Sequence, residues 1–161
     1  MKRSSNTFKP IAGYAALRRI LRFNDQGLIP TIIQDARSRQ PLTLCYLNEA
    51  ALKKSLETGT VYLFRRSQNR LMLKGETSGH IQTIRQLLVD CEGKSLVLLV
   101  SQKVAACHTG YFTCYFRRIG KNGTLTTIGK RVFDPSKVYR SGEVAQWRSG
   151  RLTRSLRHFA T

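Results

Sequence analysis

Short apolar segments recur along the chain between residues 28 and 132, separated by polar turns rich in Gly, Asn and Asp. Segments of this kind, with frequent β-branched and aromatic residues, are typical of β-strands. They predict strands at residues 28–36, 42–47, 61–64, 71–73, 81–89 and 95–102, and a final hairpin formed by 113–119 and 124–132 around the turn 120–123.

Two segments have helical rather than alternating periodicity. Residues 14–23 place apolar side chains three to four positions apart, with arginines between them. Residues 49–57 follow Asn48, a favourable N-cap, and precede Gly59, which suits a left-handed C-cap. The pattern predicts an α+β fold, a small strand-rich domain with short helices and a mainly antiparallel or mixed sheet. The sequence contains no internal repeat, Walker motif or dinucleotide-binding glycine pattern.

Composition supports one folded domain outside membranes. The chain has 161 residues, of which 41% are hydrophobic and 9% aromatic, enough for a substantial core. No apolar run approaches the roughly 18 residues that a membrane-spanning helix needs. Lys2 and Arg3 are not followed by an apolar segment, so no secretory signal is predicted. We therefore expect a cytoplasmic protein with no membrane partner.

The net charge of +19 is concentrated at the two ends of the chain. Residues 1–22 contain six basic residues and no acidic one, and residues 140–161 contain five arginines against Glu143. Such a chain is expected to bind anions such as phosphorylated molecules or nucleic acid. We divide it into a basic N-terminal extension with a short helix (1–23), a central domain (24–139) and an Arg-rich, disordered tail (140–161). A solvated surface with counterions is the simplest interpretation of the two ends, and they are the only parts through which nucleic acid could bind.

Three of the four cysteines suggest a metal site. Cys107 and Cys114 can converge if the chain turns between them, and Gly110 permits that turn. Cys91 lies between two acidic residues, an unusual setting for a core cysteine. Three thiolates would leave one position open on zinc, as in catalytic sites, and the neighbouring His108 could act as a base. The alternative is a set of buried cysteines, which is the role we expect for Cys45 on its apolar strand.

The segment 74–79 has the composition of a phosphate-binding loop. Two glycines let backbone N–H groups approach an anion, two hydroxyls can donate, and a lysine supplies charge. Its residues are Lys74, Gly75, Glu76, Thr77, Ser78 and Gly79. Three nearby arginines (Arg65, Arg66, Arg70) strengthen this interpretation, although an ordinary polar turn has the same pattern.

These motifs, taken in order, resemble one enzyme family. The matching segments are 28–30, 34–35, 46–49, 51–52, 56–59, 74–79, 90–92, 107–110 and Cys114, and the segment 132–139 looks like an end found in some members. Over about residues 24–139 the chain is similar to phosphoribosyl-AMP cyclohydrolase of histidine biosynthesis. The resemblance implies a homodimeric zinc hydrolase that opens the adenine ring of phosphoribosyl-AMP at the N1–C6 bond, the third step of that pathway.

The resemblance also implies roles for individual residues. One zinc ion per subunit would be held by Cys107 and Cys114 together with Cys91, which is shared across the dimer. His108 would transfer protons as zinc-bound hydroxide attacks C6. Arg66 and the loop 74–79 would bind substrate phosphate.

Magnesium binding is expected to be weakened in this chain. The family's D-C-D-x-D segment, which normally supplies three carboxylates to Mg²⁺, here has Asp90, Glu92 and, at the third position, Lys94. Two carboxylates can still hold Mg²⁺, but more weakly, and the Lys94 ammonium could replace part of the metal's charge.

Two other functions fit parts of the sequence. A catalytically impaired basic zinc module that binds nucleic acid or another polyanion would account for the charge and for Lys94, but zinc-finger spacing and a base-stacking motif are missing. Zinc deamination of a related nucleotide would require a ligating His near a Glu and a C-x-x-C pair, which the sequence lacks.

Overall fold

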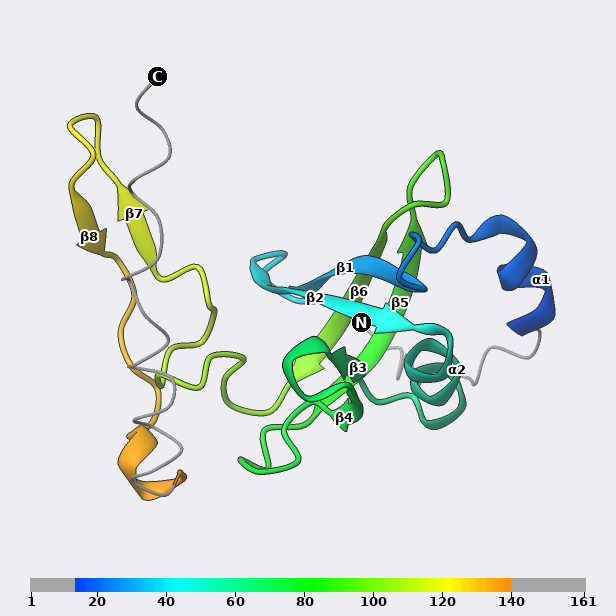
Figure 1. The fold of residues 1–161 in the computed structure, drawn as a ribbon. Helices are drawn as coiled ribbons and strands as arrows, with labels where there is room; N and C mark the ends of the chain where they lie inside the picture. Colours follow the sequence, from blue (N-terminus) through cyan, green and yellow to red (C-terminus); the bar gives the residue numbers. More distant parts are fainter. Residues whose placement is uncertain (1–13, 140–161) are drawn as a thin grey trace, which may run out of the picture.

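A four-stranded sheet forms the centre of the computed structural model, which describes residues 14–139 (Figure 1). Its strands lie in the order β2 (Pro41–Asn48), β1 (Leu28–Asp35), β6 (Leu96–Gln102) and β5 (Gln82–Val89). The pairs β1–β2 and β5–β6 are antiparallel, whereas β1 and β6 are parallel. The mixed sheet and short helices confirm the α+β prediction.

One face of this sheet packs against α2 (Glu49–Thr58), and the core lies between them. The helix begins where the Asn48 side chain accepts a hydrogen bond of 2.8 Å from the backbone N–H of Ala51. It ends at Gly59, which has φ +68° and donates its N–H to the Ser55 carbonyl. Both predicted caps are thus confirmed, and they orient the helix so that its apolar side, including Leu52, is buried.

A small hairpin follows the helix and leads into the predicted anion-binding loop. It consists of β3 (Tyr62–Arg65), a 3₁₀ turn (Arg66–Gln68) and β4 (Arg70–Leu73). At the end of β4 the backbone N–H of Lys74 donates to the Val61 carbonyl, and the loop 74–79 then turns back toward β5.

The N-terminal helix α1 (Tyr14–Ile20) is shorter than predicted, because the chain leaves it to bury Leu21 in the core. The next residue, Arg22, donates its N–H to the Gly93 carbonyl over 2.7 Å. Residues 14–23 therefore contact the central domain. The remainder of the predicted N-terminal extension and the predicted tail lie outside the described residues.

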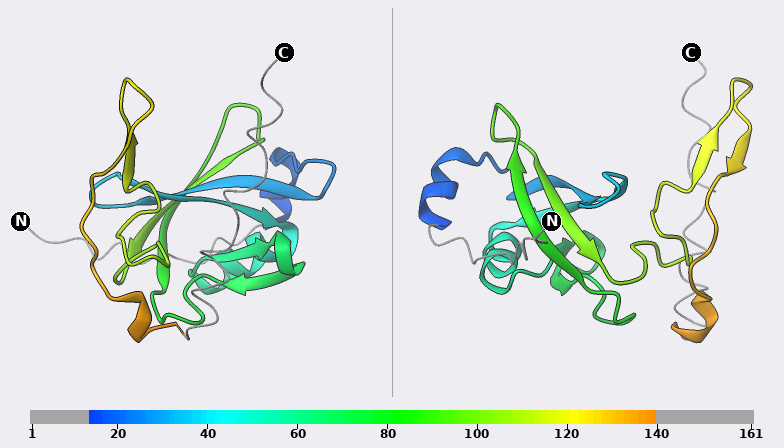
Figure 2. Two further views of the ribbon diagram at one scale, coloured as in Figure 1. Left: turned by 60° about the vertical axis from the view of Figure 1, so that its left-hand side comes forward. Right: turned by 180° about the vertical axis from the view of Figure 1, so that it is seen from behind.

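The last hairpin extends away from the sheet as an arm, which we define as residues 115–132 (Figures 1 and 2). Its strands, β7 (Arg117–Ile119) and β8 (Leu125–Thr127), surround the predicted turn but are much shorter than predicted. The prediction was wrong on length because Thr113 and Cys114 bond to the backbone of β2 instead: the Thr113 hydroxyl donates to the Pro41 carbonyl and the Cys114 N–H to the Leu42 carbonyl. After the arm, a 3₁₀ turn (Pro135–Lys137) ends the described chain.

None of the helices within residues 14–139 has the length and apolar character needed to cross a bilayer.

Candidate active site

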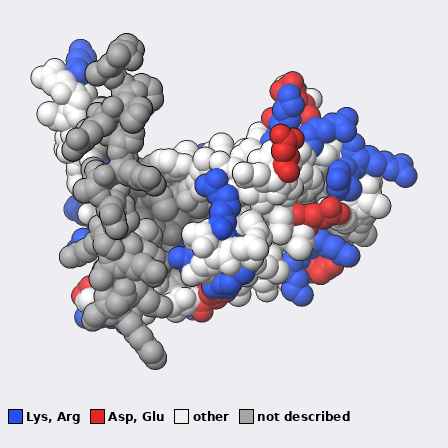
Figure 3. Space-filling model, viewed as in Figure 1, with Lys and Arg blue, Asp and Glu red and all other residues white. Residues whose placement is uncertain are grey.

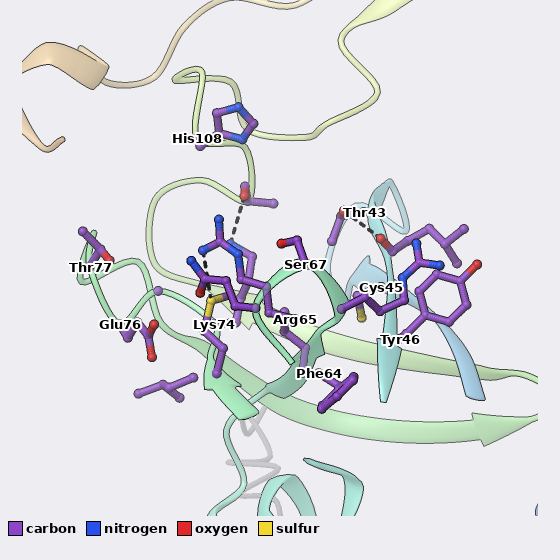
Figure 4. A pocket seen from close by; sticks show the side chains of 18 of the residues that line it. Thr43, Cys45, Tyr46, Phe64, Arg65, Ser67, Lys74, Glu76, Thr77 and His108 are labelled. Atoms are coloured by element: carbon purple, nitrogen blue, oxygen red, sulfur yellow. Dashed lines mark hydrogen bonds between the residues drawn. The ribbon is translucent and has the colours of Figure 1, made fainter. Parts of the chain in front are cut away.

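A cavity of about 1300 Å³ lies between β2, the β3–β4 hairpin, the loop 74–78 and the turn that follows β6 (Figure 4). Its lining brings together residues that are far apart in the sequence. The predicted site residues among them are Arg66, Lys74, Gly75, Glu76, Thr77, Ser78, His108 and Cys114. One pocket thus contains most of the predicted phosphate-binding residues, the predicted base and one predicted zinc ligand.

A tight turn brings the Cys107 and Cys114 thiols together. The backbone N–H of Gly110 donates to the Cys107 carbonyl, and the backbone N–H of Cys107 donates to the Tyr111 carbonyl. Gly110 has φ +94°, and a Cβ at this position would lie 2.5 Å from the Phe133 carbonyl oxygen, so only glycine fits. The turn brings the side chain of Cys114 to that of Cys107, where a hydrogen bond between the two thiols shifts the pKa of both.

The hydrogen bond between the two thiols shifts their pKa values in opposite directions. The hydrogen bond from Cys114, helped by the Thr109 hydroxyl at 2.8 Å, lowers the pKa of Cys107 to about 5. The same bond and burial raise the pKa of Cys114, although a hydrogen bond from Thr43 opposes that rise. A thiolate with a neighbouring thiol is a soft donor pair suited to Zn²⁺.

Lys74 connects the loop to the cysteine turn. Its ammonium donates a hydrogen bond of 2.9 Å to the carbonyl of Ala106, the residue before Cys107. Burial lowers the pKa of Lys74, and the nearby thiols, Cys114 first among them, oppose that change. A cation at this position stabilises thiolate charge beside the pocket.

His108 lies at the edge of the pocket, on the cysteine turn (Figure 4). Partial desolvation lowers its pKa, and the positive charges of Lys74 and Arg65 lower it further, against the opposing effect of Cys107. A neutral imidazole is therefore favoured near pH 7. It can accept a proton there, as a general base must.

The arginines around the pocket already have partners within the chain. The Arg66 guanidinium lies 4.0 Å from the centre of the Tyr46 ring. Arg70 forms an ion pair with Glu76, and that hydrogen bond lowers the pKa of the Glu76 carboxyl. The charge of Glu76 is thus compensated, which leaves the loop able to accept an anion.

The predicted magnesium segment lies elsewhere, in the turn between β5 and β6. Asp90 accepts hydrogen bonds from the backbone N–H of Lys94 at 2.7 Å and from the Ser95 hydroxyl at 3.0 Å. Desolvation raises the pKa of Asp90, but these hydrogen bonds together outweigh it and lower that pKa. The Lys94 ammonium forms an ion pair with Glu92 at 3.1 Å. In this turn a lysine therefore neutralises one of the two carboxylates predicted to bind Mg²⁺.

The structure does not bring Cys91 to the other two cysteines. Cys91 is exposed before β6 begins, whereas Cys107 and Cys114 follow its end. Seven strand residues at about 3.3 Å each separate the two places by roughly 20 Å. Within residues 14–139 no three His, Cys, Asp or Glu side chains gather closely enough to hold a metal.

Four further residues line the pocket to which the sequence analysis gave no role in the site, namely Thr43, Cys45, Tyr46 and Tyr139. Cys45 does contact the core as predicted, but it is half-buried and also forms part of the pocket wall, where burial raises its pKa to about 12. Thr43 and Cys45 are two positions apart on β2, so their side chains lie on the same face of the strand. The sequence shows this spacing, but it does not show that residues far away in the chain complete the pocket opposite them.

Comparison with known proteins identifies the family. The model of the family described as phosphoribosyl-AMP cyclohydrolase matches residues 43–116. A phosphoribosyl-AMP cyclohydrolase from Granulibacter bethesdensis is 47% identical over 122 residues, which are 76% of this chain and 95% of that protein. This chain belongs to the phosphoribosyl-AMP cyclohydrolase family.

Two further relatives support this assignment. The enzyme of Pelotomaculum thermopropionicum is 41% identical over 119 residues, or 74% of this chain and 92% of its own length. The histidine biosynthesis bifunctional protein HisIE of Thermoanaerobacter pseudethanolicus is 50% identical over 119 residues, and the match spans 55% of that longer protein. The resemblance found in the sequence is confirmed, and the chain is a hydrolase.

Proposed function

We propose that this protein hydrolyses the N1–C6 bond of the adenine ring in phosphoribosyl-AMP, using zinc, as a step of histidine biosynthesis in the cytoplasm. The observation that carries the proposal is the pocket lined by His108, Cys114 and the lysine loop, with the thiol of Cys107 hydrogen-bonded to Cys114. Each of these groups has a task in hydrolysing a doubly phosphorylated nucleotide.

The cysteine pair fits a zinc ion. The lowered pKa of Cys107 favours its thiolate form, and a bound zinc ion would displace the proton of the Cys114 thiol, whose pKa is raised. Soft thiolates are preferred zinc ligands, and binding displaces their protons. With Cys91 of a second subunit as third ligand, zinc would act as a Lewis acid that lowers the pKa of water in the pocket.

The remaining pocket residues bind substrate and transfer protons. His108, neutral because of partial burial and neighbouring cations, takes a proton from the attacking water and can return it to the leaving N1. Thr77, Ser78 and the backbone of the loop 74–79 donate to phosphate oxygens. Arg66, held over Tyr46, supplies a guanidinium for the second phosphate.

We infer that Mg²⁺ contributes less here than three carboxylates would allow. Asp90 and Glu92 provide two carboxylates, and the Lys94 ammonium is paired with Glu92 in the position of the third. A hydrated Mg²⁺ must displace this ammonium in order to bind both acids.

Turnover of phosphoribosyl-AMP tests the proposed function directly. Purified, zinc-loaded protein is given the substrate with and without Mg²⁺, and ring opening is followed by absorbance, with Cys107→Ala as the inactive variant. Turnover that is lost in Cys107→Ala is the expected result. No turnover from a folded, zinc-loaded protein would overturn it and favour a basic zinc module that binds polyanions.

A further inference from the structure

The chain that follows the arm returns to the pocket as a short segment, which we call the strap and define as residues 133–139. The backbone N–H of Val132, the residue before the strap, donates to the Gly110 carbonyl over 2.7 Å. The strap then passes close to the cysteine turn, since a Cβ on Gly110 would lie 3.2 Å from the Cδ atom of Pro135. It is therefore held against the turn that carries His108.

The strap also contacts the end of the loop 74–79. The edge of one ring meets the face of another where Phe133 packs on His80, with ring centres 4.6 Å apart and an angle of 77° between the planes. His80 follows the loop directly, and its backbone N–H donates to the Ser78 hydroxyl at 3.2 Å. One short segment thus touches both the cysteine turn and the loop, two parts of the candidate site that are far apart in the sequence.

A local turn fixes where the strap ends. Asp134 accepts hydrogen bonds from the backbone N–H of Ser136 at 3.0 Å and from its hydroxyl at 2.8 Å, so the 3₁₀ turn begins at a capped residue. The Tyr139 N–H donates to the Pro135 carbonyl over 2.9 Å. The Tyr139 side chain is half-buried and lines the cavity. Backbone bonds therefore place an aromatic ring in the pocket wall.

The hairpin side of the cavity is basic. The β3–β4 hairpin contributes Arg65 and Arg66 to the lining, and basic side chains lie over this hairpin in Figure 3. Among residues 14–139, the strap contributes to the lining only the uncharged ring of Tyr139. Guanidinium groups are suited to phosphate, whereas an aromatic ring is suited to a nucleobase, because every base has a face that can stack.

The other two aromatic rings of the lining, apart from His108, are less suitable for stacking near the reacting atoms. The Tyr46 ring already has the Arg66 guanidinium 4.0 Å from its centre. Phe64 lies on the hairpin, and Figure 4 shows it on the opposite side of the pocket from His108. Tyr139 instead belongs to the strap, which contacts the turn that carries His108.

We propose that Tyr139 binds substrate by packing its ring against the purine of the nucleotide, and that the strap forms the pocket wall beside the reacting atoms. This inference rests on the proposed function, which supplies a purine nucleotide as the ligand. It assigns recognition of the base to the strap and recognition of phosphate to the hairpin and the loop 74–79. A sugar phosphate that lacks a base should then bind equally well with or without the Tyr139 ring.

Calorimetric titration of the zinc-loaded full chain tests this assignment with two probes. Adenosine monophosphate has a base and a phosphate, whereas ribose 5-phosphate has the phosphate alone. Tyr139→Ala should weaken binding of adenosine monophosphate about tenfold and leave that of ribose 5-phosphate unchanged. Tyr139→Phe keeps the ring and should bind both probes as the wild type does. Val132→Ala changes a side chain that is 48% exposed just before the strap, and serves as the control that should alter neither.

Three results would overturn the inference. One is unchanged binding of adenosine monophosphate by Tyr139→Ala. Another is an equal loss for both probes, because that would show a general effect on the site rather than contact with the base. The third is a wild-type protein that binds neither probe. The expected selective loss, found in a protein that does not open the ring of phosphoribosyl-AMP, would leave this inference standing while the proposed function fails.

Photolabelling examines the contact without any substitution. The 8-azido derivative of adenosine monophosphate has its reactive group on the purine itself. After illumination of the zinc-loaded full chain, we expect label on the peptide that contains Tyr139, and unmodified adenosine monophosphate should suppress it. Label confined to the β3–β4 hairpin, or to peptides outside the pocket, would refute the contact.

Discussion

The Lys74 ammonium lies 2.9 Å from the carbonyl oxygen of Ala106 and so joins the loop 74–79 to the cysteine turn. Each end of this bond adjoins residues that were predicted to form the site. Lys74 begins the loop 74–79, and Ala106 precedes Cys107. We therefore expect anion binding at the loop to depend on the position of the cysteine turn, through this one hydrogen bond.

Loss of this bond should destabilise the protein. Lys74→Met keeps the length of the side chain but leaves the mostly buried Ala106 carbonyl without its donor, which costs about 1–3 kcal/mol of unfolding free energy. Urea unfolding of the metal-free protein measures this loss. Lys103→Met removes an exposed lysine and serves as the matched control. Equal effects of the two substitutions would show that the bond is unimportant.

The thiol of Cys107 should remain reactive in acid. Because Cys114 and Thr109 stabilise its thiolate, alkylation of Cys107 in zinc-free protein should become half-maximal near pH 5, and should slow below that pH as the thiolate gains a proton. Peptide mass spectrometry after iodoacetamide treatment gives the rate at each pH. Cys114→Ala removes the strongest hydrogen bond and should move the midpoint to higher pH. A midpoint that does not move would show that Cys114 does not stabilise the Cys107 thiolate.

Gly110→Ala should disrupt the cysteine turn. The new Cβ would meet the Phe133 carbonyl oxygen at 2.5 Å, in addition to the cost of a positive φ. Gly123→Ala carries a similar φ penalty, at +74°, with nothing within 4 Å of the Cβ. We expect Gly110→Ala to lower the unfolding free energy by about 1–3 kcal/mol more than Gly123→Ala, and to weaken zinc binding. Thermal unfolding and a zinc-chelator competition measure the two effects. Similar losses for both variants would count against the close approach.

Lys94→Asp should restore magnesium binding. The change removes the ammonium paired with Glu92 and adds a carboxylate beside Asp90. A two-unit change in local charge should tighten Mg²⁺ binding at least about tenfold, measured by calorimetric titration. Lys121→Asp makes the same charge change on the arm and controls for net charge. Tight binding by the unchanged protein, with no gain in Lys94→Asp, would show that Lys94 does not replace the metal.

Most secondary structure was predictable because its signals are local. Asn48 and Gly59 begin and end α2 through hydrogen bonds within a few residues, so the bounds of the helix are determined by the local sequence. The strands of the last hairpin are shorter than predicted. Their apolar pattern is typical of strands, but Thr113 and Cys114 form hydrogen bonds with the backbone of β2 instead. A local sequence pattern cannot predict such a contact between distant segments.

The candidate site likewise has features that were predictable from the sequence and others that were not. The sequence by itself determined the residue types: a lysine loop, a histidine beside a cysteine, a second cysteine seven positions on, and a glycine that allows the turn. Only the tertiary structure decided that Thr43 and Cys45 form a wall of the pocket, that Lys74 bonds to Ala106, and that β6 separates Cys91 from the other thiols. These relationships depend on how strands pair across long sequence separations, and strand pairing is set by the burial of the whole core rather than by any one motif.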